Sequence, residues 1–416
     1  MFRKLCIFIL LVPVVAYAQL PEEPGPYEVG CRLRVLEKES VTDTTTRVMD
    51  IYVWYPADPG SGFWLDEVQA YWNARPLPGD TARPVLVFSH GGCGYSLASR
   101  YFTTHIASWG IIVISTMHPG SIYGDPDCLD SAALTDTWAN RPSDVEFTLN
   151  SIIQLSRDSV SLFGHLDTTR MGMSGHSFGA RTTYAVCNRQ DWARCAVAFS
   201  GDYDDVLGAS INCMEDVRGV DVPMILMNGT HDLGLSTEHM LEIFDSIPAP
   251  KYALNIRRAT HFSFADTCLD ELDPFCGEDF VLGYDTAHAI INRYATSFIF
   301  KYLVGDDRFE ECLTDTADTL VALWYQLPAR VEEDFSPGDF SLSVYPNPFN
   351  SSCWISVSAN ASVEIFDILG GQLFSVYGIG NRQCQWQPDE DTPSGLYIVR
   401  ATSCGRSLTK WVVYLK

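Results

Sequence analysis

The stretch RMGMSGHSFGAR, from Arg170 to Arg181, decides how the rest of the sequence is interpreted. It begins with an apolar run, places Ser177 between Gly175 and Gly179 in the pattern G-x-S-x-G, and leads into the helix-like run ARTTYAVC. Glycine allows the chain to reverse where a side chain would clash. This strand–turn–helix setting predicts that Ser177 is a nucleophile on a sharp turn at a strand end. The alternative is a tight turn whose serine has no chemical role.

A serine hydroxyl is a poor nucleophile without a neighbouring base. With this motif, an acid and then a histidine follow the serine along the chain. The run MILMNGTHD carries Asp232 at the end of a predicted strand, and the next predicted strand leads into RRATHFSF with His261. We therefore assign His261 as the general base and Asp232 as the group that orients it. Three aspartates after the preceding strand compete for the acid role: Asp202, Asp204 and Asp205.

Acyl transfer also needs hydrogen-bond donors for the oxyanion. One expected donor is the backbone N–H of Phe178, directly after the serine. The second is expected from the stretch SHGGCGY, where we choose the N–H of Gly92, with Cys93 as the alternative. A glycine-rich turn without a ligand is the competing interpretation. Cys93 has no elbow around it, so a disulfide role suits it better than a nucleophilic one.

Several residues near these motifs allow a functional and a structural interpretation. Tyr95, Phe262 and Phe264 form either an apolar wall for an acyl group or part of the core, and we take Tyr95 and Phe262 as candidate substrate contacts. His118 is interpreted as a structural turn histidine. Asp144 follows Pro142 in RPSDVEFTLNSIIQL and is interpreted as a residue at a helix start.

Strand-like and helix-like runs alternate from about Tyr27 to Leu303. Apolar, β-branched runs such as RPVLVF, GIIVIST and VPMILM are typical of buried strands, and KYALNIRRATHF is the last of them. Alternating strands and helices predict an α/β fold, with a mostly parallel sheet covered by helices on both faces. Active sites in such sheets lie at the carboxyl ends of the strands.

The two ends of the chain differ from this central region. Residues 1–18 combine Arg3 and Lys4 with a short apolar run that ends in Ala-Tyr-Ala, which predicts a cleaved signal peptide rather than a membrane anchor. We expect a catalytic domain over 19–328 and an acidic linker over 329–340. Residues 341–416 contain only short strand-like runs separated by turns, which predicts a small β-sandwich.

Composition excludes some partners and indicates the compartment. The formal net charge of −24 argues against binding to nucleic acid or to an anionic membrane. An exported chain with 13 cysteines, one of them in the signal peptide, indicates disulfides. Close pairs such as Cys187/Cys195 and Cys268/Cys276 are candidates. We expect no metal site, because there is no C-x-x-C pair and no histidine cluster with zinc spacing.

The motifs VWYPA, VFSHGG, HPGS, RPSDVEFTLN, RMGMSGHSFGAR, MNGTHD and ATHFSFAD occur in this order along the chain. Together they resemble the α/β-hydrolase fold, in the branch of secreted esterases related to platelet-activating-factor acetylhydrolases and polyester hydrolases. The resemblance extends from about Met49 to Tyr302. It implies a Ser177–Asp232–His261 triad, carboxylic-ester substrates and no cofactor.

The end of the chain has a second resemblance. SVYPNPFNSS, VEIFDILGG, SGLYIVRAT and a final lysine after LTKWVVYL are similar to the C-terminal sorting domains of the bacterial type IX secretion route. The resemblance implies contact with secretion machinery and a secreted or cell-surface location. A structural or binding sandwich is the alternative.

These observations favour a secreted serine hydrolase of carboxylic esters, acting on small, lipid or polyester substrates in the manner of an acetylhydrolase, a lipase or a polyester hydrolase. The alternative is a non-catalytic adhesin or polymer-binding protein on a hydrolase scaffold. The presence of all three triad residue types in the expected order argues against the second interpretation.

Overall fold

A computed structural model describes the chain in ten segments: residues 19–125, 127–205, 208–268, 273–327, 342–357, 361–368, 370–379, 383–389, 391–403 and 406–416. The expected signal peptide (1–18) and the expected linker (329–340) lie outside these residues. The chain divides into two compact units, with the boundary between Pro328 and Ala329. Within the described segments, no helix combines the length and hydropathy needed to cross a bilayer.

The first unit is built on one eleven-stranded sheet, in the order β11-β10-β9-β8-β7-β5-β6-β2-β1-β4-β3. The six strands from β10 to β6 in this order are mutually parallel, and antiparallel β11 and β2 flank them. The strands are β1 (Val29–Glu39), β2 (Thr46–Pro56), β3 (Phe63–Leu65), β4 (Ala70–Trp72), β5 (Arg83–Ser89), β6 (Ile112–Thr116), β7 (Leu166–His176), β8 (Ala193–Phe199), β9 (Met224–His231), β10 (Lys251–Thr260) and β11 (Val321–Gln326).

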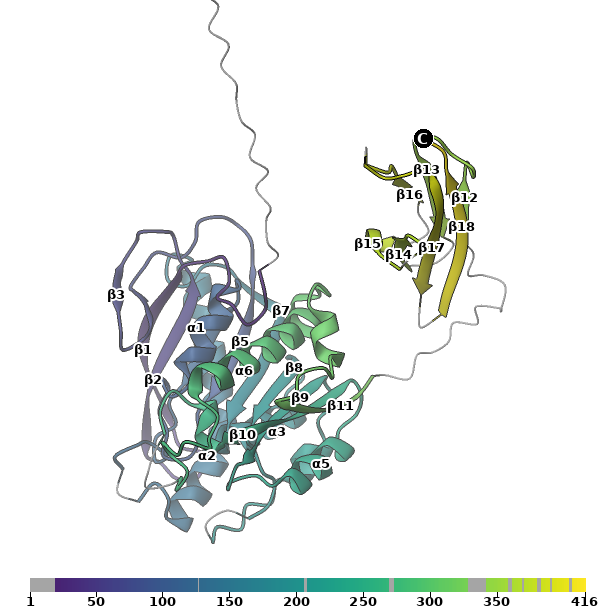
Figure 1. Cartoon of the computed structure of the whole chain (residues 1–416). Coiled ribbons are helices and arrows are strands. Elements are labelled where there is room, and N and C mark those ends of the chain that lie inside the picture. The colour runs from purple at the N-terminus through teal and green to yellow at the C-terminus, as the bar shows by residue number, and fades with distance from the viewer. Residues whose placement is uncertain are drawn as a thin grey trace, which may run out of the picture. The chain divides into compact units, whose positions relative to one another are not determined.

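Helices cover both faces of this sheet (Figure 1). The described helices of the unit are α1 (Arg100–Ser108), α2 (Ser131–Asp158), α3 (Phe178–Arg189), α4 (Met214–Arg218), α5 (Thr237–Ser246) and α6 (Tyr284–Ile299), with the shorter η1 (His261–Phe264), η2 (Phe300–Val304) and η3 (Glu310–Thr314). The apolar side chains of α2, α3, α4 and α5 pack on one face, and those of α1 and α6 pack on the other.

Central strand β5 explains why the sheet is buried on both sides. Its residues alternate between the two apolar clusters, with Val85 and Val87 in one and Leu86 and Phe88 in the other. Successive side chains of a strand point to opposite faces, so a continuous apolar run needs a helical layer on each side. The prediction of an α/β fold with a mostly parallel sheet therefore agrees with the structure.

Two expectations about secondary structure are corrected. KYALNIRRATHF is not the last strand of the unit, because β11 follows it and pairs antiparallel with β10 at the sheet edge. Helix α2 does not begin near Pro142 but at Ser131, where the Asp130 side chain accepts the N–H of Ala132, and Pro142 lies inside the helix. Asp144 is consequently a mid-helix residue, and it is completely buried.

The second unit contains two small antiparallel sheets around a separate core. One sheet has the order β12-β13-β16 and the other β15-β14-β17-β18. Ile355, Val363, Val399 and Val412, from both sheets, are fully buried in one cluster. The strands are β12 (Leu342–Tyr345), β13 (Cys353–Val357), β14 (Ala361–Phe366), β15 (Gln372–Ile379), β16 (Gln383–Trp386), β17 (Gly395–Ser403) and β18 (Arg406–Tyr414). A small β domain follows the large sheet, as expected.

Strand β2 provides a matched test of the core. Val53 is fully buried, whereas Val48 on the same strand is 47% exposed. Val53→Ala removes two buried methyl groups, so we expect it to lower the free energy of unfolding of the first unit by about 2 kcal/mol. Val48→Ala makes the same truncation at a solvent-exposed position, so it should lower the free energy of unfolding by about 0.5 kcal/mol or less. Urea unfolding followed by tryptophan fluorescence measures both, and equal losses would contradict this account of the core.

Candidate active site

Ser177 lies between β7 and α3 in a strained backbone conformation. Its φ is 56° and its ψ is −119°, in a region that residues with a side chain rarely adopt. Neighbouring backbone imposes this turn. A Cβ on Gly179 would lie 1.9 Å from the carbonyl oxygen of Ser89, and a Cβ on Gly175 would lie 2.2 Å from the carbonyl oxygen of Gly179. Both positions therefore require glycine.

Asp232 and His261 are in direct contact. Asp232 follows β9, His261 follows β10, and the Nδ1 of His261 lies 2.9 Å from the Oδ1 of Asp232. The carboxylate also accepts the backbone N–H groups of Gly234 (2.7 Å) and Leu235 (3.1 Å), which fix its orientation. Because Asp232 accepts at Nδ1, the Nε2 of His261 is left to face another partner.

The charges of Asp232 and His261 shift the pKa of both groups. Burial alone would lower the pKa of His261, but the charge of Asp232 and its hydrogen bond outweigh burial and raise it. Burial alone would raise the pKa of Asp232, but His261 outweighs that effect and lowers it. The aspartate is thus ionised at neutral pH, and it stabilises a positive charge on the imidazole.

The loop that carries His261 is held from several sides. The backbone N–H of Thr260 donates to the Oγ of Ser263 (2.9 Å) at the start of the turn η1. His176 donates from Nε2 to the backbone carbonyl of His261 (3.0 Å), and burial, assisted by the His261 charge, lowers the pKa of His176 to about 3. His176 is therefore neutral, and it links the serine turn to the histidine loop.

The glycine-rich loop after β5 packs directly against the serine turn. A Cβ on Gly91 would lie 3.2 Å from the Cβ of Ser177, and a Cβ on Gly92 would lie 3.9 Å from the Cβ of Phe178. Within the described part of the chain, the backbone N–H groups of Gly92 and Phe178 have no hydrogen-bond acceptor. The two predicted donors are therefore neighbours in space, and both are free to bind a ligand.

A cavity of about 620 Å³ opens over these groups. Ser177, His261, Gly92 and Phe178 line it, together with Tyr95. Of the other two candidate aromatics, Phe262 lines the cavity, whereas Phe264 is fully buried in the core, where it stacks on Phe199. The structure thus brings the predicted site residues together around one cavity, with Asp232 behind His261. A hydrogen bond between Ser177 and His261 is not among the contacts of the described residues.

The competing aspartates have other partners. Asp202 lines the cavity, but its carboxylate contacts the Nδ1 of His239 at 3.0 Å. The carboxylate of Asp204 accepts from the backbone N–H of Asp205 (2.9 Å) and from the Nδ2 of Asn212 (3.4 Å). None of these contacts places a carboxylate on His261, so the geometry favours Asp232 as the orienting acid.

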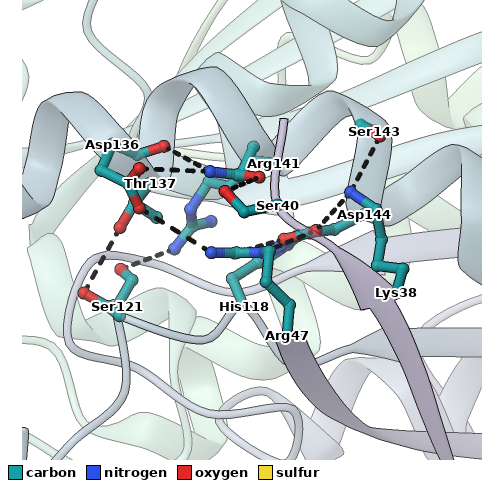
Figure 2. Close-up of polar contacts among 12 residues, drawn as sticks. Lys38, Ser40, Arg47, His118, Ser121, Asp136, Thr137, Arg141, Ser143 and Asp144 are labelled. Carbon is teal, nitrogen blue, oxygen red and sulfur yellow. Dashed lines mark hydrogen bonds and ion pairs between the residues drawn. The ribbon is translucent and has the colours of Figure 1, made fainter. Parts of the chain in front are cut away.

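The sequence motifs did not reveal a buried polar cluster around Asp144 (Figure 2). Asp144 accepts from the Nε and Nη2 of Arg47 (3.1 and 2.7 Å) and contacts the Nδ1 of His118 (3.1 Å). The Nε2 of His118 lies 2.9 Å from the Oγ of Ser89. Arg141 is fully buried beside this group. The interpretation of His118 as a turn residue and of Asp144 as a helix start missed these contacts, whose partners are distant in sequence.

Ser89, His118 and Asp144 form a second Ser–His–Asp arrangement in this cluster. All three are 0% exposed, and none of them lines the cavity. The Oγ of Ser89 is also within 3.3 Å of a guanidinium nitrogen of Arg141, so both sides of the hydroxyl are engaged. Burial lowers the pKa of His118 to about 4. We interpret Ser89, His118 and Asp144 as a structural group, because the buried serine is not accessible to a substrate.

The disulfides differ in part from expectation. Cys268–Cys276 is formed, and Cys93 pairs with Cys128. The suggested pair Cys187/Cys195 is wrong: both are free thiols, and their side chains belong to apolar clusters on opposite faces of the sheet. A carboxylate oxygen of Asp273 lies within 4.8 Å of the sulfurs of Cys268 and Cys276, but thiols joined in a disulfide cannot bind a metal as thiolates.

Comparison with known proteins gives two similarities. Residues 343–414 match the family described as the secretion system C-terminal sorting domain. The chain is also similar to the platelet-activating factor acetylhydrolase of Cavia porcellus, with 19% identity over 374 residues. That alignment covers 73% of this chain and 82% of the acetylhydrolase.

The two disulfides allow a stability prediction. Cys93–Cys128 spans a sequence separation of 35, and Cys268–Cys276 spans only 8. Because a cross-link restricts the unfolded chain more when it closes a longer loop, Cys93→Ser/Cys128→Ser should cost about 3–4 kcal/mol and Cys268→Ser/Cys276→Ser about 2–3 kcal/mol. Urea unfolding without reductant measures both. A larger loss from the short loop would contradict the prediction.

Proposed function

We propose that this chain is a serine hydrolase of carboxylic esters with the α/β-hydrolase fold, using Ser177, His261 and Asp232. The Asp232–His261 contact, on the cavity that Ser177 faces from a glycine-bounded elbow, is the observation that carries the proposal. The parallel sheet with helices on both faces and the similarity to an acetylhydrolase add support.

In the proposed mechanism, the Oγ of Ser177 attacks the ester carbonyl carbon while the Nε2 of His261 accepts the hydroxyl proton. The carbonyl oxygen becomes an oxyanion. When the tetrahedral intermediate collapses, the C–O bond to the alcohol breaks, and the imidazolium returns the proton to the departing alcohol. Water then repeats the sequence on the acyl-enzyme, releasing the carboxylic acid and restoring Ser177.

Each neighbouring group has a defined part in this scheme. The carboxylate of Asp232 holds His261 in the tautomer that leaves Nε2 free to accept the proton, and it stabilises the imidazolium. The N–H groups of Gly92 and Phe178 stabilise the oxyanion. Tyr95 and Phe262 offer apolar surface to the acyl group. The reaction so described uses water together with side chains and backbone of this chain.

The location proposed for this activity is outside the cell or at its surface. The C-terminal sorting-domain match indicates export, and the disulfides Cys93–Cys128 and Cys268–Cys276 fit an oxidising compartment. The predicted signal peptide would begin that route. An acidic chain without charge attraction to anionic membranes suits a soluble or polymeric ester at this location.

Ser177→Ala tests the nucleophile. We expect hydrolysis of p-nitrophenyl butyrate to fall by about 10⁵–10⁶-fold, because no other hydroxyl is held at the elbow. The matched control is Ser174→Ala on β7, the strand that leads into the elbow, where the buried hydroxyl only donates to the carbonyl of Val87. This control should keep kcat within about threefold. A fluorophosphonate probe should label the peptide that contains Ser177.

The acyl length of the substrate is tested in the same assay, with p-nitrophenyl esters of acetate, butyrate, octanoate and palmitate. A preference for acetate indicates acetylhydrolase-like use, and a preference for palmitate indicates lipase-like use. Hydrolysis that survives Ser177→Ala would overturn the mechanism. No turnover of any ester by the folded protein would favour the polymer-binding alternative.

The His261–Asp232 pair predicts the pH dependence of kcat/KM. His261 must be neutral to accept a proton, so activity is lost as the pH falls through its pKa. Since that pKa is raised, the midpoint of the acid limb should lie above 6.5. Asp232→Asn leaves burial, which lowers the pKa of His261, opposed only by the weaker charge of Asp273. The midpoint should therefore fall below 6.5, with a loss in kcat of about 10⁴-fold.

A pH-stat titration of butyrate ester hydrolysis measures the acid limb of the unmodified protein and that of Asp232→Asn. Asp202→Asn is the matched control, because it neutralises another aspartate of the cavity without touching His261. Its midpoint should stay with that of the unmodified protein. The assignment of the acid fails if Asp202→Asn moves the midpoint and Asp232→Asn does not.

A further inference from the structure

We propose that Arg141 is a positioning residue that holds the peptide between Gly91 and Gly92 in the orientation needed for the oxyanion hole. The inference rests on the proposed function and adds a residue outside the cavity to it. Arg141 lies on α2, is fully buried, and does not line the cavity. It acts only through the backbone of the glycine-rich loop.

The guanidinium of Arg141 binds two successive carbonyls of this loop. Nη1 donates to the carbonyl of His90 at 2.6 Å, and Nη2 donates to the carbonyl of Gly91 at 2.9 Å. The planar, forked guanidinium suits two acceptors with this spacing, whereas an ammonium group is a point donor. Nη2 also donates to the Oγ of Ser121 at 3.0 Å, which keeps the fork in place.

The contact with Gly91 determines where the Gly92 amide points. A peptide unit is planar and trans, so its C=O and N–H point in opposite directions. The carbonyl of Gly91 and the N–H of Gly92 belong to the same unit. When Arg141 holds this carbonyl on the side of α2, the N–H is directed away from α2, toward the cavity that Gly92 lines.

This peptide needs to be held because a glycine stands on each side of it. Without a Cβ, glycine tolerates backbone angles that other residues avoid, so the unit between Gly91 and Gly92 can rotate more easily than most. A rotated unit would place a carbonyl where the oxyanion forms. The Nδ1 of His90 (2.7 Å) and the N–H of Gly94 (3.3 Å) also donate to the Gly91 carbonyl, and Arg141 supplies the charged donor among the three.

Arg141 also contacts the second donor residue. Its guanidinium carbon lies 4.7 Å from the ring centroid of Phe178, a cation–π distance, and the backbone N–H of Phe178 is the other proposed oxyanion donor. One side chain therefore touches both residues whose amides form the hole.

The buried polar cluster holds the cation in this place. Burial lowers the pKa of Arg141 to about 9, partly offset by the negative charge of Asp144, so the guanidinium stays protonated at neutral pH. Ser89 and His118 complete the surroundings, with the Oγ of Ser89 3.3 Å from Nη1. The second Ser–His–Asp arrangement is thus explained as the support of Arg141 and of the strand end that starts the loop.

Arg141→Lys is the test, made in the full chain. Lysine keeps the charge and cannot bind both carbonyls in the same way. We expect kcat for p-nitrophenyl butyrate to fall by about 10–100-fold, with KM changed by less than about threefold, because the hole acts on the transition state. The Ki of a butyl trifluoromethyl ketone, whose hemiketal oxygen occupies the hole, should rise by the same factor as kcat/KM falls.

Arg47→Lys is the matched control. Arg47 is 5% exposed and pairs with Asp144 in the same cluster, but it touches neither the loop nor Phe178. Both lysine variants should lower Tm. Only Arg141→Lys should raise the Ki of the ketone, whereas Arg47→Lys should keep it within about twofold. A purely structural role for Arg141 predicts equal Ki values for the two variants, and that result overturns the proposal.

If Arg141→Lys does not fold, Ser121→Ala takes its place, because it removes one guanidinium contact and leaves Arg141 present. We then expect a loss of about threefold in kcat with a matching rise in Ki, and unchanged values overturn the proposal. Ser177→Ala in the same assay separates the two hypotheses. Activity that survives Ser177→Ala rules out the proposed function. If Ser177→Ala is inactive while Arg141→Lys keeps the kcat and Ki of the unmodified protein, only the role of Arg141 is ruled out.

Discussion

The close approach of the α3 N-terminus to the end of β5 is the constraint on which the site depends. Gly179 touches the backbone of Ser89, and this contact leaves no room for a side chain. Ser177 is forced into a positive φ and toward the cavity at the carboxyl ends of the parallel strands. The same contact places the loop after β5 against the elbow, so the Gly92 and Phe178 amides become neighbours. A looser packing would relax the backbone strain at Ser177, and it would also move the Gly92 and Phe178 amides apart.

The buried polar cluster is the electrostatic counterpart of this packing. Asp144, Arg47 and Arg141 lie between α2 and the sheet, where an unpaired charge would cost several kcal/mol. Burial alone would raise the pKa of Asp144, but hydrogen bonds from His118 and Arg47 and the charge of Arg47 outweigh it and lower the pKa to about 2. Asp144 therefore stays ionised and balances the arginines. An apolar layer could fill this space, but it could not orient the carbonyls of the glycine-rich loop. The geometry of those carbonyls explains why the fold keeps charge there.

Local patterns in the sequence predict the elements that depend on local forces. The apolar runs, the elbow glycines and the short strand-like runs of the second unit correspond to observed strands and turns. The start of α2 was missed because Pro142 resembles a first-turn proline, whereas tertiary packing lets the helix continue through it from Ser131. The contacts of Arg141 with Gly91 join residues 50 apart, and no periodicity encodes such a pair. The Cys93–Cys128 pair escaped for the same reason, whereas Cys268–Cys276, only 8 residues apart, was among the predicted pairs. The pair Cys187/Cys195 was wrong because the two thiols lie on opposite faces of the sheet.

The distribution of cysteines connects the fold to its compartment. Cys187 and Cys195 lie in the core, where burial raises the pKa of each thiol and keeps it unreactive. The two disulfides lie in loops at the cavity, and Cys93 directly follows Gly92. Loops bury too little apolar surface to hold a site by packing, so covalent links replace the missing core. Such links form in oxidising surroundings, which the export indicated by the sorting domain supplies. The chemistry at the cavity rim and the destination of the chain are therefore consistent with each other.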